Sequence, residues 1–321
     1  MSFRNPSPPL DYECETTSQP NATVAPIILR LVENVIGDNM DGLQLDSIED
    51  TPLERTLCAA WDLASIDEYA AAMLENNIQV IALKICTSTK RPRTRELTVG
   101  TLANIACHHD TGAVLLEQED IFLLISSILW NENDARVLHE ATRLLEGFLV
   151  FTINMAEQSV IDSPHLTRFL ATAADRPSVI SRYMVIVMNT LNTELLVRSL
   201  QVIRHMIVYM QATDLLYSSP ELKSDALKLV TWATERLEEE GRGIGIGGFN
   251  KTVAKNLMHV VWAIGAYKIV ESSEYDHVLA TSLAQSMKRI QSYIDEEYDI
   301  TQEDEAIQDL AKLLTESLHI E

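Results

Sequence analysis

The chain has 321 residues, of which 46% are hydrophobic and 22% are charged, and its formal net charge is −22. This apolar content is that of a folded protein with a large core. The length suits one elongated solenoid or two compact domains. A surface this acidic repels the phosphates of nucleic acids and anionic lipid, so we predict no direct nucleic-acid partner and no membrane. The charge either keeps the protein soluble or attracts a basic partner.

The cysteines and the N-terminus indicate the compartment. None of Cys14, Cys58, Cys86 and Cys107 belongs to a Cys-x-x-Cys pair or has a histidine at zinc-finger spacing. We therefore expect free thiols in a reducing compartment. The first residues lack the apolar core of a secretory signal, and no apolar run is long enough to cross a bilayer. A soluble intracellular protein is expected.

Residues 1–25 are rich in Pro, Ser, Thr and Asn and poor in large apolar side chains. Such a segment buries too little surface to offset the entropy of ordering it, so we predict a disordered tail. Within it, Ser7 precedes a proline, which is the form of a proline-directed phosphorylation site. A merely flexible tail is the alternative.

Beyond the tail, apolar residues recur at helical spacing and polar or Gly/Pro breakers separate the runs. Thr51 is a plausible helix cap with Pro52 at the first helical position. Strict alternation is absent, so almost no sheet is expected. The predicted helices cover residues 27–36, 53–63, two segments of 67–86 around Asn76-Asn77, 95–107, 113–117, 121–130, 135–151, 166–174, 178–191, 194–211, 220–240, 250–271, 274–297 and 303–318.

Two of these segments share one layout. Leu102 matches Leu145 and Ile105 matches Phe148 at an offset of roughly 43 residues, and residues 60–64 echo residues 102–106 in the same way. This spacing is typical of armadillo or HEAT repeats, whose helical units bury their apolar faces against neighbouring units. We predict an all-α armadillo/HEAT-like solenoid. Helical repeats would span residues 26–240, a Gly-rich linker 241–250 and a C-terminal helical cap 251–321.

The Gly-rich stretch from Gly245 to Thr252 nearly fits the phosphate-binding loop Gly-x-x-x-x-Gly-Lys-Thr. Asn250 stands where that loop needs a glycine, and an acidic helix end precedes the stretch where the loop needs a buried strand. A linker is favoured, and a nucleotide-binding enzyme is the alternative. His108-His109-Asp110 does not fit a metal site, because adjacent helical residues point to different faces. We predict no cofactor, no metal and no catalytic residues.

Two features are candidates for binding a protein partner. Arg91, Arg93 and Arg95 form the dense part of the one basic run, which suits a nuclear import signal or a patch for an acidic partner. The alternative is an interhelical turn whose arginines pair with neighbouring acids. Asn104 lies where armadillo proteins often grip an extended peptide with an amide. Gly147 takes the equivalent place in the next unit, which weakens the further alternative of an import-type peptide adaptor.

Residues 4–9 and 92–107, together with Trp61-Asp62-Leu63, resemble the serum amyloid A-like protein 1 family, also described as synoviocyte proliferation-associated proteins. The resemblance covers roughly the first half of the chain. It implies an armadillo-like, intracellular and largely nuclear protein that promotes cell proliferation without being an enzyme, and a role in stabilising the message of a cell-cycle kinase has been proposed for family members. The predicted function is a non-enzymatic scaffold or adaptor in the nucleus or cytoplasm, with its partner and oligomeric state open.

Overall fold

The computed structural model describes residues 19–36, 50–154, 159–171, 178–215, 220–243 and 248–267, and, of the following segment, residues 269–270, 279, 281–283, 285–286 and 288–290. Helices account for nearly all of the regular structure in these residues. They are α1 (Pro20–Ile36), α2 (Pro52–Ala64), α3 (Asp67–Glu75), α4 (Ile78–Ser88), α5 (Pro92–Ala106), α6 (His109–Leu116), α7 (Glu119–Asn131), α8 (Ala135–Thr152), α9 (Pro164–Leu170), α10 (Val179–Asn189), α11 (Thr193–Ala212), α12 (Pro220–Gly243) and α13 (Lys251–Ala266).

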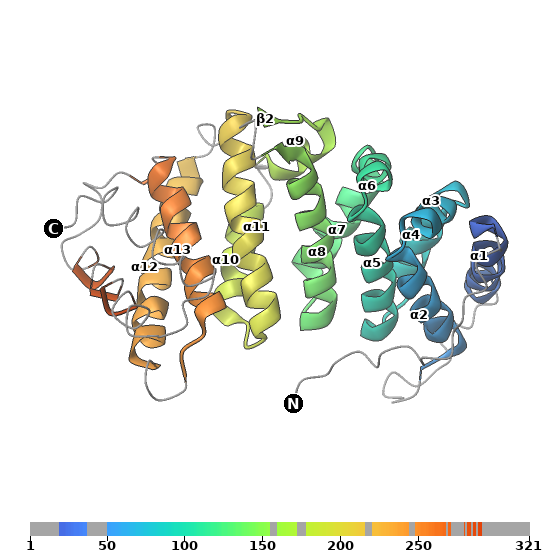
Figure 1. The fold of residues 1–321 in the computed structure, drawn as a ribbon, viewed down its shortest axis with the longest axis horizontal. Helices are drawn as coiled ribbons and strands as arrows, with labels where there is room; N and C mark the ends of the chain where they lie inside the picture. Colours follow the sequence, from blue (N-terminus) through green and yellow to red (C-terminus); the bar gives the residue numbers. More distant parts are fainter. Residues whose placement is uncertain are drawn as a thin grey trace.

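The helices form two rows. Helices α2, α5, α8, α11 and α13 pack side by side in chain order, and we call this row the front layer (Figure 1). Helices α4, α7, α10 and α12 lie behind it as the back layer, each packed against the front helix that follows it. The short helices α3, α6 and α9 join one unit to the next. Each repeat is therefore a short helix, a back helix and a front helix, as in armadillo units.

The two matched segments of the sequence occupy equivalent places in this architecture. Leu102 and Leu145 each lie ten residues after the first residue of α5 and α8, respectively, and both are fully buried. Ile105 and Phe148 are also fully buried, one turn further along. The repeat predicted from the 43-residue offset is thus present, because each unit covers the apolar face of the next.

Side-chain caps fix where several helices begin. Thr51 and Glu54 form a complete capping box at α2, with Pro52 at the first helical position as predicted. Asp134, Asn192 and Asn250 accept hydrogen bonds from the first amides of α8, α11 and α13.

The expected tail boundary at residue 25 is wrong, because α1 begins at Pro20. Polar composition concealed its contacts. Val24 is fully buried against the neighbouring helices, and Asn21 donates a hydrogen bond to Glu75 at 3.0 Å. Proline at the first turn suits a helix start, since its missing N–H would have no partner there. The rest of the predicted tail, with Ser7, lies outside the described residues.

The boundaries of the Gly-rich linker also need correction. Helix α12 continues through Gly241 to Gly243, and Asn250 caps α13, so a segment shorter than residues 241–250 joins the two helices. Helix α13 ends at Ala266, before the predicted residue 271. A short antiparallel pair, β1 (Ile153–Asn154) and β2 (Ser159–Val160), follows α8 and was not predicted. The helix predicted over 303–318 lies outside the described residues, as does most of 274–297.

Candidate functional site on the front layer

The basic run lies where the back helix α4 turns into α5, and its first arginine is structural. Arg91 is only 7% exposed and holds the fully buried Glu54 of α2 by an ion pair at 3.0 Å. Thr94 also donates a hydrogen bond to this carboxylate, at 2.8 Å. Burial alone would raise the pKa of Glu54. The hydrogen bonds from Arg91, the Thr51 amide and Thr94 outweigh it and hold that pKa below its usual value.

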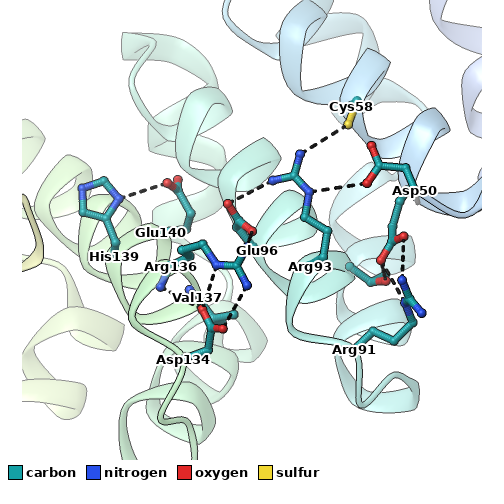
Figure 2. A network of polar contacts seen from close by, with 12 residues as sticks. Asp50, Cys58, Arg91, Arg93, Glu96, Asp134, Arg136, Val137, His139 and Glu140 are labelled. Carbon is teal, nitrogen blue, oxygen red and sulfur yellow. Dashed lines mark hydrogen bonds and ion pairs between the residues drawn. The ribbon is translucent and has the colours of Figure 1, made fainter. Parts of the chain in front are cut away.

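Arg95 and Arg93 also pair with carboxylates of the chain. Arg95 reaches Glu132, at the end of α7, at 2.5 Å. Arg93 contacts Glu96 at 3.0 Å and Asp50 at 3.8 Å, and its side chain keeps 32% of its surface exposed (Figure 2). The three arginines therefore fit the interhelical turn that the sequence left as an alternative. Of the three, Arg93 is the most open to a partner.

Asn104 is a link between three front helices. Its Nδ2 donates to the carbonyl of Trp61 on α2 at 2.9 Å, and its Oδ1 accepts from Arg143 on α8 at 2.7 Å. The Arg143 guanidinium lies 6.0 Å from the centroid of the Trp61 ring, which is within cation–π range. That indole packs on Gly100, where an added Cβ would come within 2.3 Å of the ring. Asn104 is 8% exposed, and both the nitrogen and the oxygen of its amide already form hydrogen bonds within the chain.

Beside this link lies a hollow of about 410 Å³ that we call the α5/α8 hollow. Gly147 lines it, and a Cβ at this position would meet its nearest neighbour, the carbonyl oxygen of Ala106, at an ordinary 3.5 Å. Phe151 supplies an apolar wall and stacks on His109 with ring centroids 5.1 Å apart. Arg143, Glu146 and Arg198 supply charge. The hollow can accept a side chain that is partly apolar and partly polar.

A second hollow, of about 570 Å³, lies further along the front layer between α8, α11 and the start of α13, and we call it the α8/α13 hollow. His139 of α8, Gln201 of α11 and Asn250 line it. Arg198 lines both hollows and forms an ion pair with Glu146 at 2.5 Å. The two hollows therefore adjoin each other at this arginine, and together they touch the four front helices α5, α8, α11 and α13.

Within the described ranges, no group of three or more His, Cys, Asp or Glu side chains is placed to hold a metal ion. No helix among the described residues is both long and apolar enough to cross a bilayer. The stretch from Gly245 to Thr252 is preceded by α12, a helix, where a phosphate-binding loop needs a strand. The side chain of Asn250 is used to cap α13.

The sequence did not point to Trp61, Arg143 or Arg198. The partners that define their roles lie on other helices: Arg143 binds the amide of Asn104 on α5, and Arg198 binds the carboxylate of Glu146 on α8. In the repeat alignment, Gly147 occupies the position equivalent to Asn104. This replacement of an amide side chain by a glycine was the sequence feature that pointed to the hollow.

An all-α solenoid of three-helix units is an armadillo-like repeat protein. Among solved structures, the designed armadillo repeat protein YIII(Dq)4CqI matches with a TM-score of 0.52 and 13% identity, over 94% of this chain and 100% of that one. The designed armadillo repeat protein YIII(Dq.V1)4CPAF in complex with peptide (KR)4 matches with a TM-score of 0.50 and 13% identity, over 85% and 96%. Likeness at this identity shows the fold alone.

The curated relatives make the assignment more specific. Zebrafish (Danio rerio) protein saal1 is 33% identical over 153 residues, which cover 44% of this chain and 32% of that protein. Human protein SAAL1 is 25% identical over 166 residues, covering 52% and 32%. No protein-family model matches. The chain is a SAAL1-like, armadillo-like protein, and the matched segment spans about a third of the length of these relatives.

Proposed function

We propose that this chain is a non-enzymatic scaffold that binds an extended segment of a partner protein across its front layer. The observation that carries the proposal is the pair of adjoining hollows, which meet at Arg198 and together touch α5, α8, α11 and α13. Both are open and lined by mixed polar and apolar side chains, which suits adaptable recognition of a peptide more than enclosure of a small substrate. A structural neighbour that is named as a complex with a peptide supports the same kind of ligand.

Helix spacing sets the geometry of the ligand. Packed helices lie about 8–10 Å apart, and an extended chain rises about 3.3 Å per residue. A peptide that crosses the layer therefore advances by about three residues per front helix. Side chains of the same kind at that spacing would meet equivalent positions on successive repeats.

The sequence-predicted contacts take different roles in this proposal. Arg93 offers exposed charge at the edge of the layer, next to Arg136 and Glu96. Arg91 and Arg95 hold α5 to its neighbours, and Asn104 positions Arg143 beside the α5/α8 hollow. The buried members of this set would act on a partner by shaping the surface.

Filling the α5/α8 hollow tests the proposal. A full-length Gly147→Gln, Arg198→Glu variant adds a side chain at Gly147, where a Cβ meets only ordinary contacts, and reverses the charge that both hollows share. Urea unfolding shows whether this variant folds. Proximity labelling in cells followed by mass spectrometry should lose a set of proteins that the wild type labels. Arg168→Glu on α9 is the matched control, because that arginine lines neither hollow. Identical sets for the two variants would refute the proposal.

We also propose, from the similarity to SAAL1 proteins, that the chain acts in the nucleus and promotes cell proliferation. Imaging of the tagged full-length protein tests the location, and a cytoplasmic signal that excludes the nucleus would contradict it. Depletion in cultured cells should slow proliferation, and re-expression of the Gly147→Gln, Arg198→Glu variant should not restore it. Restoration by that variant would separate the growth effect from the front layer.

A further inference from the structure

Helices α11 and α13 pack against each other at the end of the front layer (Figure 1). Four nitrogen-bearing side chains lie on these two helices. Gln201 and Thr252 line the α8/α13 hollow on these two helices. On α11, Arg204 and His205 lie one helical turn after Gln201. On α13, Lys255 lies one turn after Thr252, and His259 lies one turn after Lys255. We call Arg204, His205, Lys255 and His259 the α11/α13 seam. All four are half-buried.

Unlike the other buried and half-buried arginines of the front layer, the seam has no counter-charge within the described residues. Arg91, Arg143 and Arg198 each pair with a glutamate at 3.0 Å or less. None of the four seam residues has an ion pair or a side-chain hydrogen bond with any described residue. The Nδ1 atom of His205 is buried and lacks a hydrogen-bond partner there.

The two cations of the seam, Arg204 and Lys255, disfavour protonation of its histidines. Burial and then the nearby Arg204 lower the pKa of His205 to about 4. Burial, followed by Arg204, Lys255 and His205, lowers the pKa of His259 to about 4. Burial likewise lowers the pKa of Arg204. Holding positive charge together in a half-buried place costs free energy, and an anion placed between the groups would offset that cost.

We infer that the α11/α13 seam binds an anionic group of a protein partner, either a phosphorylated side chain or closely spaced carboxylates, at the end of the front layer. The inference rests on the proposed scaffold function. Arg204 offers a planar fork of donors that matches the two oxygens of a phosphate or carboxylate, and Lys255 adds a compact charge. The adjoining α8/α13 hollow gives the rest of the peptide a place to lie.

The net charge of −22 does not oppose this. At physiological ionic strength the Debye length is about 8 Å, so distant acids are screened while cations in contact with the ligand are not. A nucleic acid is disfavoured, because it presents many phosphates to a surface that is otherwise acidic. A short acidic segment of a protein presents its charge only at the seam.

Labelled peptides test the inference on the full chain. The probes are a Gly-Ser peptide carrying one phosphoserine, the same peptide without phosphate, a short oligoglutamate and a single-stranded oligothymidine. The variant is Arg204→Gln, Lys255→Gln. Its control is Lys228→Gln, Arg242→Gln, which removes the same charge from exposed positions of α12. Fluorescence anisotropy gives affinity, and urea unfolding shows whether each variant folds.

We expect the phosphopeptide or the oligoglutamate to bind the wild type and the control variant. The unphosphorylated peptide should bind neither protein. The tighter of the two identifies the source of the anion. The seam variant should bind about tenfold or more weakly, the scale of losing contacts with a charged group. It should unfold at the same or higher urea concentration, because repulsion is removed.

Equal binding by the seam variant, no binding of either anionic peptide, or preferred binding of the oligothymidine would each overturn the inference. The Gly147→Gln, Arg198→Glu experiment keeps the two proposals distinguishable. If that variant loses partners while neither anionic peptide binds at the seam, the scaffold function is supported and the anion site is refuted.

Discussion

The two ends of the front layer handle positive charge in opposite ways. Around α2, α5 and α8, arginines are matched with glutamates, as in the Arg91–Glu54 and Arg143–Glu140 pairs. At α11 and α13, Arg204 and Lys255 lie close together without such partners among the described residues. Matched charges lock helices to each other, whereas unmatched charges cost stability and are available to a ligand. The first region is therefore expected to be sensitive to mutation in folding, and the second in binding.

The largest effect should come from removing Arg91. Arg91→Ala leaves Glu54 fully buried without its cation, which should destabilise the protein by about 3–5 kcal/mol. Urea unfolding followed by circular dichroism measures this. Arg204→Gln, at the unmatched end, serves as the comparison and should leave stability unchanged or raised. If the two variants lose similar stability, the contrast between the regions is wrong.

A smaller effect is expected at the glycine under Trp61. Gly100→Ala forces a methyl group into the indole, since the Cβ position is 2.3 Å from the ring, and should cost about 1–3 kcal/mol. Gly147→Ala, in the next front helix, meets only ordinary contacts and should be neutral or stabilising by up to about 1 kcal/mol. Thermal unfolding of the pair would show this difference, and an equal loss in both would mean that Trp61 moves aside freely.

The hydrogen bonds of Asn104 should contribute less to the free energy of unfolding than the two features above. Asn104→Ala removes its hydrogen bonds to the Trp61 carbonyl and to Arg143, with an expected cost of about 1–2 kcal/mol. A double-mutant cycle with Arg143→Ala isolates the second bond, and additive losses would indicate that the two side chains do not cooperate. The same variant should alter partner labelling more than Arg168→Glu does, because Arg143 lines the α5/α8 hollow.

The pH dependence of stability tests the unmatched end. In the folded chain the pKa of His205 and of His259 is about 4, below the ordinary value of 6.5. Below pH 6.5 the two histidines bind protons in the unfolded chain but remain neutral in the folded chain. The free energy of unfolding should therefore fall as the pH drops from about 6.5 to about 4. Urea midpoints measured at about pH 7 and about pH 5 should differ less in His259→Gln than in the wild type.

The control for the pH experiment is His109→Gln, whose side chain is 83% exposed. It should keep the pH dependence of the wild type. The range down to about pH 5 also avoids the protonation of Glu54, whose pKa is held below its usual value and which loses its contribution only at lower pH. An unchanged pH dependence in His259→Gln would mean that the seam is more open to water than its geometry indicates.

The fold was accessible from the sequence because its evidence is local. Apolar spacing and the offset between Leu102 and Leu145 predict stacked helical units, and Thr51 with Pro52 marks a helix start without any tertiary information. The tail boundary was misplaced because Pro20 and Asn21 continue a segment whose composition is typical of disorder, while their helix is held by contacts with distant residues. Local composition carries no record of such contacts.

The candidate site was only partly accessible. The sequence predicts candidate contacts at Arg91, Arg93, Arg95 and Asn104. It does not decide whether the arginines are free or paired with acidic side chains. Glu54 lies 37 residues before Arg91, and Trp61 lies 43 before Asn104. Pairings over such separations are set by how the helices stack.

The sequence by itself determined an acidic, helical repeat protein similar to SAAL1, because hydrophobic periodicity and repeat offset are properties of neighbouring residues. The tertiary structure alone decided which charges are neutralised. Electrostatic energy depends on distance and burial, and both are fixed only when α2, α5, α8, α11 and α13 pack side by side. Arg91 thereby became a structural residue, and Arg204 with Lys255 the place where we expect an anionic partner to bind.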